Sequence, residues 1–175
     1  MKIVVTGGAG FIGSRFVKLC LENNHTVKII DKLTYAADLN RLPKDIVLYG
    51  PYSIVDNIDI CNVTCDDLEG ADYIVNFAAE THVDNSIKDG KPFIRSNVEG
   101  VFNLIEQARK VGVKKFIQIS TDEVYGDILE GESKETDNIE PSSYYSATKA
   151  AADMLVLSAH RTYGLPYIIT RTCNN

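Results

Sequence analysis

The chain has 175 residues, 45% of them hydrophobic and 24% charged, with a formal net charge of −6 at pH 7. This composition predicts one globular domain with a real core and excludes a disordered chain. The negative charge argues against a general nucleic-acid binder, and no apolar run reaches the length of a membrane span or forms a signal-peptide core. We therefore expect a cytoplasmic protein with neither nucleic acid nor membrane as a partner.

The first stretch, Lys2–Gly13, predicts a strand, a glycine turn and a helix in that order. Ile3–Val5 is a run of β-branched residues that suits a buried strand, and an amphipathic pattern from Phe11 to Cys20 predicts the helix. The glycines between them fit two spacings of a dinucleotide-binding turn: Gly8–Gly10–Gly13 and Gly7–Gly10–Gly13. Bare backbone and a helix N-terminus favour a bound diphosphate, and a tight turn without a ligand is the alternative.

The second predicted strand is Thr26–Asp31, and it ends on a carboxylate. Asp31 lies about twenty residues beyond the glycines, where dinucleotide-binding folds place the acid that accepts the adenosine ribose hydroxyls. This position favours NAD and disfavours the extra phosphate of NADP, although the neighbouring Lys32 tempers that choice. The alternative for Asp31 is a helix cap or a solvated turn residue.

The middle of the chain contains shorter signals. We expect a helical turn at Asp38–Leu42, a weak third strand at Tyr52–Asp59, a short helix at Cys65–Leu68 and a buried strand at Asp72–Phe77. Asp59 and Ile60 fit an acid and an apolar cover for an adenine ring, and a capped turn fits them nearly as well. Ala78 and Ala79 are small enough at a strand end for a ligand to approach, or simply pack tightly.

The second half alternates helices and strands. Its predicted elements are a long helix at Pro92–Val111 ended by Gly112, a strand at Lys114–Ser120, an acidic loop at Ile128–Pro141, a helix at Ser142–Tyr163 and a strand at Leu165–Thr170. The alternation predicts an α/β fold of the Rossmann type, a doubly wound parallel sheet with helices on both faces. Residues 1–175 would form one NAD-binding domain.

The four cysteines form no Cys-x-x-Cys pair, and the three histidines are scattered. We therefore expect free thiols and no metal site.

Two groups of polar residues carry possible chemistry. Tyr145 and Lys149 lie four apart on a predicted helix, where an ammonium would lower the pKa of the phenol and make it a proton acceptor. Thr121, Asp122 and Glu123 follow the fifth strand, where two carboxylates can divide acid and base roles. A solvated helix pair and an exposed acidic turn, with Asp122 as a cap, are the alternatives.

Six segments together resemble the extended short-chain dehydrogenase/reductase family, and within it the 4,6-dehydratases of dTDP-glucose. They are Thr6–Gly13, Asp31–Ala36, Ala78–Asp84, Ser120–Gly126, Tyr145–Lys149 and the terminal Asn174-Asn175. The Thr-Asp-Glu triplet is the discriminating piece, because related epimerases and decarboxylases usually have a Ser or Thr there without the two acids. The resemblance covers nearly the whole chain, and it implies a cofactor domain truncated before the family's C-terminal substrate-binding portion.

The resemblance also implies a hydro-lyase mechanism. NAD would oxidise the sugar at C4, with Tyr145 taking the hydroxyl proton and Thr121 bonding the same oxygen. Glu123 would remove the C5 proton, Asp122 would protonate the departing C6 hydroxyl, and the hydride would return to C6. Another extended reductase, such as a sugar-nucleotide epimerase, and a non-catalytic NAD-binding module remain alternatives. The nucleotide base, the sugar and the pathway stay open.

The family's binding residues carry over by position. The implied cofactor contacts are Gly7, Gly10, Phe11, Ile12, Gly13, Asp31, Lys32, Leu33, Thr34, Asp59, Ile60, Phe77, Ala78, Ala79, Glu80, Thr81, Ser96, Tyr145, Lys149 and Asn175. The implied contacts to the nucleotide-sugar substrate are Thr81, Thr121 and Asn174.

The two long helices carry apolar residues on more than one face, which together with the resemblance predicts a homodimer. The residues concerned are Val101, Leu104 and Ile105 in one helix, and Met154, Leu155, Val156 and Leu157 in the other.

Overall fold

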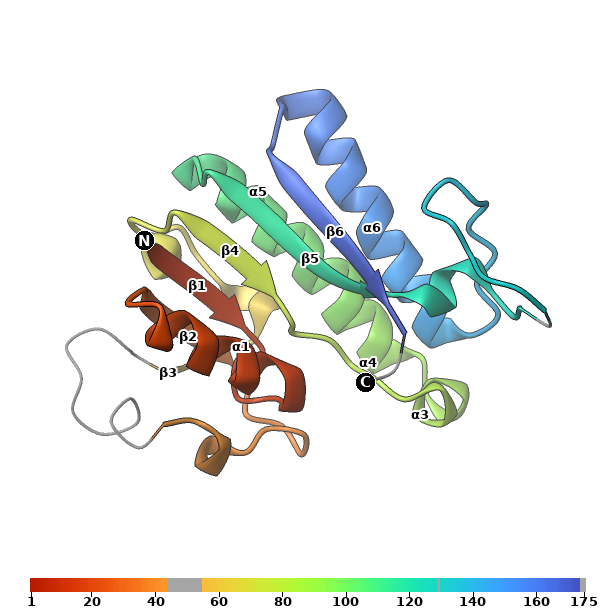
Figure 1. The fold of residues 1–175 in the computed structure, drawn as a ribbon, viewed down its shortest axis with the longest axis horizontal. Coiled ribbons are helices and arrows are strands. Elements are labelled where there is room, and N and C mark those ends of the chain that lie inside the picture. Colours follow the sequence, from red (N-terminus) through yellow and green to blue (C-terminus); the bar gives the residue numbers. More distant parts are fainter. Residues whose placement is uncertain (44–54, 129, 174–175) are drawn as a thin grey trace.

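A computed structural model describes residues 1–43, 55–128 and 130–173. Its centre is a six-stranded sheet in the order β3-β2-β1-β4-β5-β6, with every neighbouring pair parallel (Figure 1). The strands are β1 (Lys2–Thr6), β2 (Thr26–Asp31), β3 (Val55–Asn57), β4 (Tyr73–Asn76), β5 (Lys115–Thr121) and β6 (Tyr167–Thr172). The strand order reverses direction between β1 and β4, which confirms the predicted doubly wound sheet.

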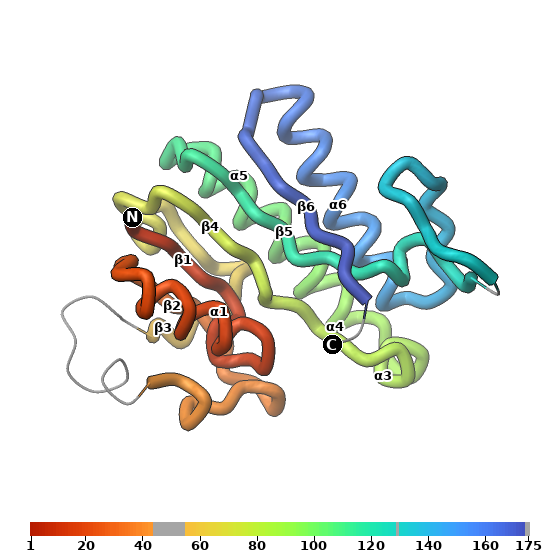
Figure 2. The backbone as a smooth tube through the Cα atoms, in the orientation of Figure 1, coloured from red at the N-terminus to blue at the C-terminus, as the bar shows by residue number. Residues whose placement is uncertain are grey.

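Helices cover both faces of this sheet. They are α1 (Phe11–Glu22), α3 (Val83–Lys88), α4 (Lys91–Phe93), α5 (Val101–Val111) and α6 (Tyr144–Tyr163). Figure 2 shows α1 on one side of the strands and α5 with α6 on the other. Short 3-10 turns lie at Leu39–Arg41, Ile60–Asn62, Asp66–Leu68 and Asp122–Tyr125.

The core has two parts because successive strand residues point to opposite faces. Ile3 and Val5 of β1 pack with Val17 of α1, whereas Val4 packs with Leu104 of α5 and Val156 of α6. Both faces of β1 are therefore buried, which explains why its sequence is a continuous apolar run rather than an alternating one.

Several elements differ from the sequence prediction. The short helix expected at Cys65–Leu68 is a 3-10 turn at Asp66–Leu68, and the last strand lies two residues later than expected, at Tyr167–Thr172. The strand expected at Tyr52–Asp59 is β3, which covers only Val55–Asn57 in the described part, and Tyr52–Ile54 lie outside the described residues. The short helix α3 was not predicted. The helix expected at Pro92–Val111 runs from α4 into α5 through a π-helical segment at Ile94–Gly100. A π-segment adds one residue to a turn, and a search for 3.6-residue periodicity does not detect it.

Four of the seven apolar residues named on the long helices are core residues and add nothing to an exposed surplus. Val101, Leu104, Ile105 and Val156 are at most 2% exposed, because α5 and α6 bury them against each other and the sheet. Leu155 and Leu157 are half-buried, and of the named residues only Met154 is exposed. The exposed apolar side chains on the two helices and the preceding π-segment include Ile94, Phe102 and Met154.

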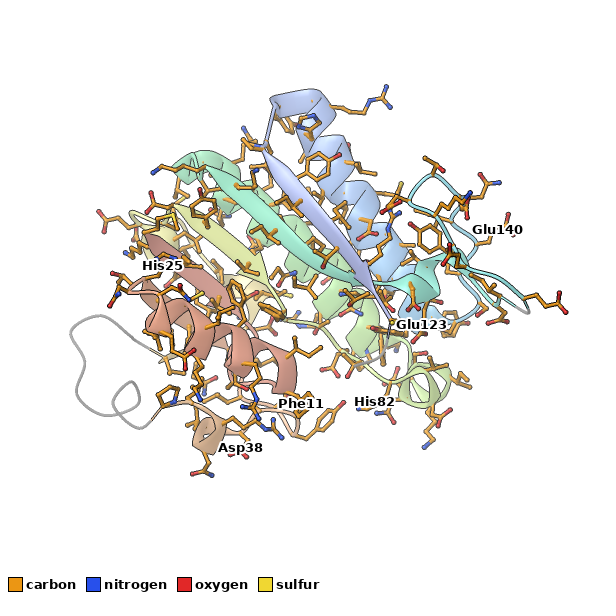
Figure 3. All side chains as sticks on the ribbon, viewed as in Figure 1. Phe11, His25, Asp38, His82, Glu123 and Glu140 are labelled. Atoms are coloured by element: carbon orange, nitrogen blue, oxygen red, sulfur yellow. The ribbon has the colours of Figure 1, made fainter. Side chains whose placement is uncertain are left out.

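The carboxyl ends of the strands form one edge of the molecule. In Figure 3, Phe11, His82 and Glu123 lie near this edge, and His25 lies at the opposite end of the strands. Helix α6 also begins here, with a capping box in which Ser143 and Ser146 bond each other's backbone N–H groups. Among the described residues, no helix combines the length and the apolar character needed to cross a bilayer.

Candidate active site

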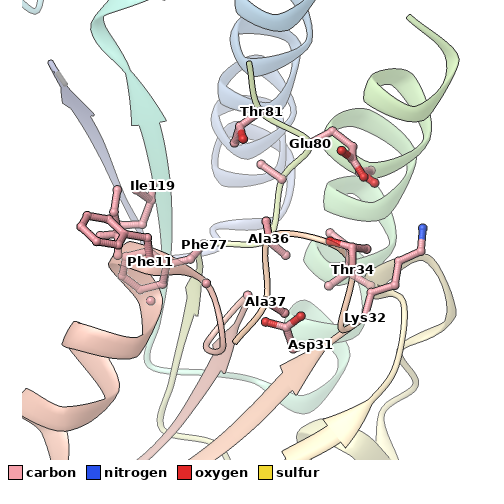
Figure 4. Close-up of a pocket in the computed structure, with 18 of the residues that line it drawn as sticks. Phe11, Asp31, Lys32, Thr34, Ala36, Ala37, Phe77, Glu80, Thr81 and Ile119 are labelled. Atoms are coloured by element: carbon pink, nitrogen blue, oxygen red, sulfur yellow. The ribbon is translucent and has the colours of Figure 1, made fainter. Parts of the chain in front are cut away.

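A cavity of about 630 Å³ opens at the carboxyl ends of the strands. Its walls come from the glycine turn, the segment after β2, the loop after β4, the end of β5 and the start of α6 (Figure 4). Parallel sheets bind ligands at this position, where the strand order reverses. Most of the predicted cofactor contacts line it: Gly7, Gly10, Phe11, Ile12, Gly13, Asp31, Lys32, Thr34, Asp59, Ile60, Phe77, Ala78, Ala79, Glu80, Thr81, Ser96, Tyr145 and Lys149.

The glycine turn is packed too closely for side chains. Gly7 has a φ of +68°, and a Cβ built on it would lie 2.6 Å from the backbone nitrogen of Ala78. A Cβ on Gly13 would lie 2.3 Å from the carbonyl oxygen of Gly7. Helix α1 starts directly at this turn, and its N-cap residue Gly10 supplies no side-chain hydrogen bond. The first N–H groups of α1 are therefore available to an anion.

Asp31 is buried at the end of β2 and holds the turn in place. One carboxylate oxygen accepts the N–H of Ala9 at 2.9 Å, and the other accepts the N–H of Leu33 at 2.9 Å. Each oxygen has a second lone pair, so the carboxylate can hold the backbone and still accept a ribose hydroxyl. The two interpretations from the sequence, structural acid and ligand acid, are therefore compatible.

Leu33 does not line the cavity, although it was predicted to. Its side chain packs against the core cluster beneath α1, and its φ of +53° turns the chain at this point. Leu33 serves the site through its N–H on Asp31.

Asp59 caps a 3-10 turn and also faces the cavity. Its carboxylate accepts the N–H of Cys61 at 3.0 Å and pairs with Lys32 at 3.1 Å and Arg95 at 3.4 Å. Burial by itself would raise the pKa of this carboxyl, but the Cys61 N–H and the Lys32 ammonium hold the pKa below its usual value. The cap that the sequence allowed is present, and Ile60 beside it lines the cavity.

The loop after β4 is fixed by Asn97, which the sequence analysis missed. The Asn97 side chain is 1% exposed, accepts the N–H of Glu80 at 2.8 Å and donates to the Glu80 carbonyl at 3.0 Å. It also donates to the Thr148 hydroxyl of α6 at 3.1 Å. Asn97 lies in the π-segment, so this irregular turn joins the cavity-lining loop to the helix that carries Lys149.

Lys149 and Tyr145 both line the cavity from α6. Lys149 is 5% exposed and its ammonium donates to the Ile119 carbonyl at 2.5 Å. Burial lowers the pKa of Lys149 to about 8. The pKa of Tyr145 is raised, chiefly by burial and then by the charge of Glu123, and the Thr121 hydroxyl only partly offsets this.

The prediction that Lys149 lowers the pKa of Tyr145 is therefore wrong for this arrangement. The Lys149 ammonium is engaged by β5, and the carboxylates at the end of the same strand oppose a negative phenolate.

The Thr121–Glu123 segment forms a capped turn. The Thr121 hydroxyl accepts the N–H of Glu123 at 3.3 Å, so Thr121, rather than Asp122, is the cap of the 3-10 turn Asp122–Tyr125. Asp122 and Glu123 line a second hollow, which shares Thr172 and Cys173 with the first cavity, whereas Thr121 lines the first. Burial, followed by the charges of Asp122 and Asp127, raises the pKa of Glu123.

Several residues at this edge were not predicted. Arg171 of β6 bonds Asp153 of α6 at 2.9 Å and donates to the Tyr125 hydroxyl at 2.7 Å. Asp153 lies 18 residues and Tyr125 46 residues before Arg171 in the sequence, so no local spacing indicates these contacts. Tyr35, Arg41, Ile119 and Ser120 also line the cavity without having been predicted. Asn174 and Asn175 lie outside the described residues.

The four cysteines are free thiols, as predicted. In residues 1–43, 55–128 and 130–173, no group of three or more His, Cys, Asp or Glu side chains is arranged to hold a metal ion.

The chain was compared with known proteins. A family model described as the NAD dependent epimerase/dehydratase family matches residues 3–175. Among curated proteins, the low-salt glycan biosynthesis protein Agl12 of Haloferax volcanii is 46% identical over 100% of this chain and 57% of its own length.

Solved structures give the same picture. DesIV, a dTDP-glucose 4,6-dehydratase of Streptomyces venezuelae solved with NAD bound, has a TM-score of 0.93 and 42% identity over 100% of this chain and 56% of its own. UDP-glucuronic acid 4-epimerase of Bacillus cereus, in complex with UDP-glucuronic acid and NAD, has a TM-score of 0.90 and 30% identity over 98% of this chain and 56% of its own. The chain therefore spans about half the length of the proteins that it matches.

The cavity fits a dinucleotide. The glycine turn lines the cavity with backbone that carries no side chains, the α1 N-terminus offers N–H groups to a diphosphate, and Asp31 lies at the end of β2, where such folds bind a ribose. The same cavity continues to Tyr145 and Lys149.

Proposed function

The chain belongs to the NAD dependent epimerase/dehydratase family, and we propose that its full-length protein converts dTDP-glucose into dTDP-4-keto-6-deoxyglucose and water. The family match and the NAD-bound neighbours confirm the resemblance to extended short-chain reductases and the prediction of NAD as cofactor. Within the family, the observation that supports a dehydratase is the placement of Asp122 and Glu123 on a turn directly after β5, next to the cavity that contains Tyr145.

Bound NAD supplies a hydride acceptor for C4 of the sugar and later a hydride donor for C6. The glycine turn and the α1 N-terminus would hold its diphosphate, and Asp31 its adenosine ribose. Lys149 would donate to the other ribose. These assignments rest on the cavity walls described above.

Tyr145 would take the proton of the C4 hydroxyl, and Thr121 would bond the same oxygen. Since burial and Glu123 raise the pKa of Tyr145, this role needs a positive charge close by. The Lys149 ammonium, one helical turn along α6, is held by the Ile119 carbonyl in this arrangement, so it would have to turn toward Tyr145 in the complex to supply that charge.

Glu123 would remove the C5 proton, and Asp122 would protonate the departing C6 hydroxyl. A base that later returns its proton to C5 works best with a pKa moved toward neutrality. The raised pKa of Glu123 supports this role.

A sugar-nucleotide 4-epimerase is the second candidate, because a UDP-sugar epimerase shares this fold at 30% identity. An epimerase has no task for an acid–base pair at C5 and C6, which favours the dehydratase. A non-catalytic NAD-binding module is less consistent with the buried Lys149 beside Tyr145.

The test is incubation of the full-length protein with NAD and dTDP-glucose, followed by identification of the product by mass and NMR. We expect a 4-keto-6-deoxy sugar with loss of one water. Glu132→Gln serves as a control for Asp122→Asn, because Glu132 is an exposed acid that lines the same hollow. A C4 epimer with no loss of water would contradict the proposal.

We further propose a cytoplasmic homodimer whose residues 1–175 form a single NAD-binding domain. The free cysteines support a reducing compartment, and the exposed Ile94, Phe102 and Met154 support a helical interface. Light scattering at micromolar concentration tests the dimer, and a clean monomer would contradict it.

A further inference from the structure

Asp153 is a fully buried carboxylate to which the proposed mechanism gives no task. It lies on α6 one turn after Lys149, with 0% of its surface exposed. Residues four apart on a helix share a face, so Asp153 lies on the same side of α6 as Lys149, and its charge opposes the effect of burial on the Lys149 pKa. A buried carboxylate is costly unless cations and hydrogen bonds compensate it, and such a group therefore calls for an explanation.

The partners of Asp153 compensate it only in part. One oxygen accepts from Nε of Arg171 at 2.9 Å, and the other oxygen has no hydrogen-bond partner among the described residues. The Ser120 hydroxyl is likewise buried without a hydrogen-bond partner among the described residues. Burial raises the pKa of Asp153, and the Arg171 guanidinium and then the nearby Ser120 hydroxyl oppose that rise only in part. Arg171 also donates to the Tyr125 hydroxyl, so its guanidinium is shared between two acceptors.

We propose that Asp153 is a positioning residue that keeps the buried ammonium of Lys149 charged where it bonds β5, with Arg171 limiting how strongly it does so. The proposal rests on the proposed function only in assigning Lys149 to the reaction. The effect of Asp153 on the charge of Lys149 is a property of the folded chain and needs neither substrate nor cofactor.

Other titratable and charged groups line the cavity and the adjoining hollow, and they must be kept constant in a test. Each of them comes from an element packed near the cavity or the adjoining hollow: Tyr145 from α6, Arg171 from β6, Asp122, Glu123 and Tyr125 from the turn after β5, and Glu80 and His82 from the loop after β4. Arg95 and Glu99 of the π-segment are exposed. None of these residues except Arg171 bonds Asp153 among the described contacts.

The expected signature is a change in how stability depends on pH. Burial lowers the pKa of folded Lys149 to about 8, whereas an unfolded lysine keeps its proton to higher pH. Above pH 8 the unfolded chain therefore holds more protons at this site, and the free energy of unfolding rises with pH. Asp153 raises the pKa of Lys149 against the effect of burial. Without Asp153 the pKa of Lys149 falls further, so the free energy of unfolding begins to rise at a lower pH.

The experiment measures urea unfolding of the full-length protein, without cofactor, from pH 6 to pH 10. Asp153→Asn and Arg171→Gln are each made in the parent and in a Lys149→Met background. Subtracting the Lys149→Met series removes all other titrating groups, so the remaining pH dependence belongs to Lys149. Asp153→Asn should lower the pH at which the free energy of unfolding begins to rise by about one pH unit, and Arg171→Gln should raise that pH.

Opposite shifts from the two variants, absent in the Lys149→Met background, would support the proposal. If each variant instead loses the same amount of stability at every pH, the proposal is overturned, because Asp153 and Arg171 would then form a purely structural ion pair. If Asp153→Asn does not fold, Arg171→Gln decides alone: an upward shift supports the proposal and an unmoved rise overturns it. A protein that shows these shifts but makes no 4-keto-6-deoxy sugar would contradict the proposed function and leave this inference standing.

Discussion

The two halves of the cavity are built differently. The half formed by β1, α1 and β2 is built around a close-packed glycine turn, which the buried Asp31 holds through the N–H of Ala9, 22 residues away. The half formed by β5, α6 and β6 presents side chains. Its charges are connected by Lys149 to the Ile119 carbonyl and by Arg171 to Asp153 and Tyr125.

Under the proposed function, this difference would separate cofactor binding from the chemical steps. The backbone of the glycine turn has no titrating group, so its function depends on how closely a ligand can approach it. In the other half, burial and neighbouring charges move the pKa values of Tyr145, Lys149 and Glu123 away from their usual values. Perturbed titrating groups gathered at one end of a cavity are typical of a reaction centre. Substitutions in the two halves should therefore fail in different ways.

The largest effects are expected in the reaction half. Tyr145→Phe in the full-length enzyme should suppress the first hydride transfer and every later step. Glu123→Gln should still form NADH on addition of dTDP-glucose but should not exchange the C5 proton. Asp122→Asn should retain both and lose mainly the elimination of water. Each change should lower turnover by roughly 10²–10⁴-fold, the range for a positioned acid or base.

A single-turnover NADH absorbance trace, recorded with deuterium incorporation at C5, separates these three variants. Exchange at the parent rate in Glu123→Gln would show that another group is the base. Complete loss of NADH formation in both carboxylate variants would show instead that the pair supports Tyr145, and the epimerase candidate would gain support.

A smaller effect is expected in the binding half, and it should appear in stability and cofactor affinity together. Gly7→Ala places a methyl group 2.6 Å from the backbone of Ala78 at a φ of +68°. Gly112→Ala is the matched control, because Gly112 has a φ of +70° and nothing within 4 Å of the added carbon. Both should lose about 1 kcal/mol from backbone strain, and Gly7→Ala should lose about 1–3 kcal/mol more from overpacking.

Urea unfolding and NAD calorimetry on the full-length protein measure both quantities. We expect NAD affinity to fall in Gly7→Ala and to stay at the parent level in Gly112→Ala. Equal destabilisation of the two variants, with NAD affinity unchanged in both, would mean that the turn tolerates a side chain and that close approach is not its role.

The same contrast explains what the sequence could predict. The glycine turn, Asp31 and the strand pattern are local, so their spacing was sufficient to predict them and the sheet that carries them. The identities of Tyr145, Lys149 and Glu123 were also evident, since the resemblance points to them. The charge states of these residues could not be predicted from the sequence, because they depend on burial and on partners such as Arg171, which no spacing reveals. Asn97 was missed for the same reason, and the π-segment that positions it has no distinct periodicity.

The smallest effect concerns Asp31, the carboxylate at the end of β2. Asp31→Asn should weaken NAD binding by about tenfold, the loss expected when a charge-assisted hydrogen bond becomes a neutral one. It should weaken NADP binding less, because the negative charge that repels the extra phosphate is gone. The control is Asp38→Asn, which removes the same charge from a nearby exposed carboxylate that caps the turn Leu39–Arg41. Calorimetry with NAD and NADP gives the ratio of the two affinities for each variant, and the parent should prefer NAD. A parent that binds NADP more tightly, or an Asp31→Asn variant whose preference matches that of Asp38→Asn, would mean that Asp31 serves only to hold the N–H groups of Ala9 and Leu33.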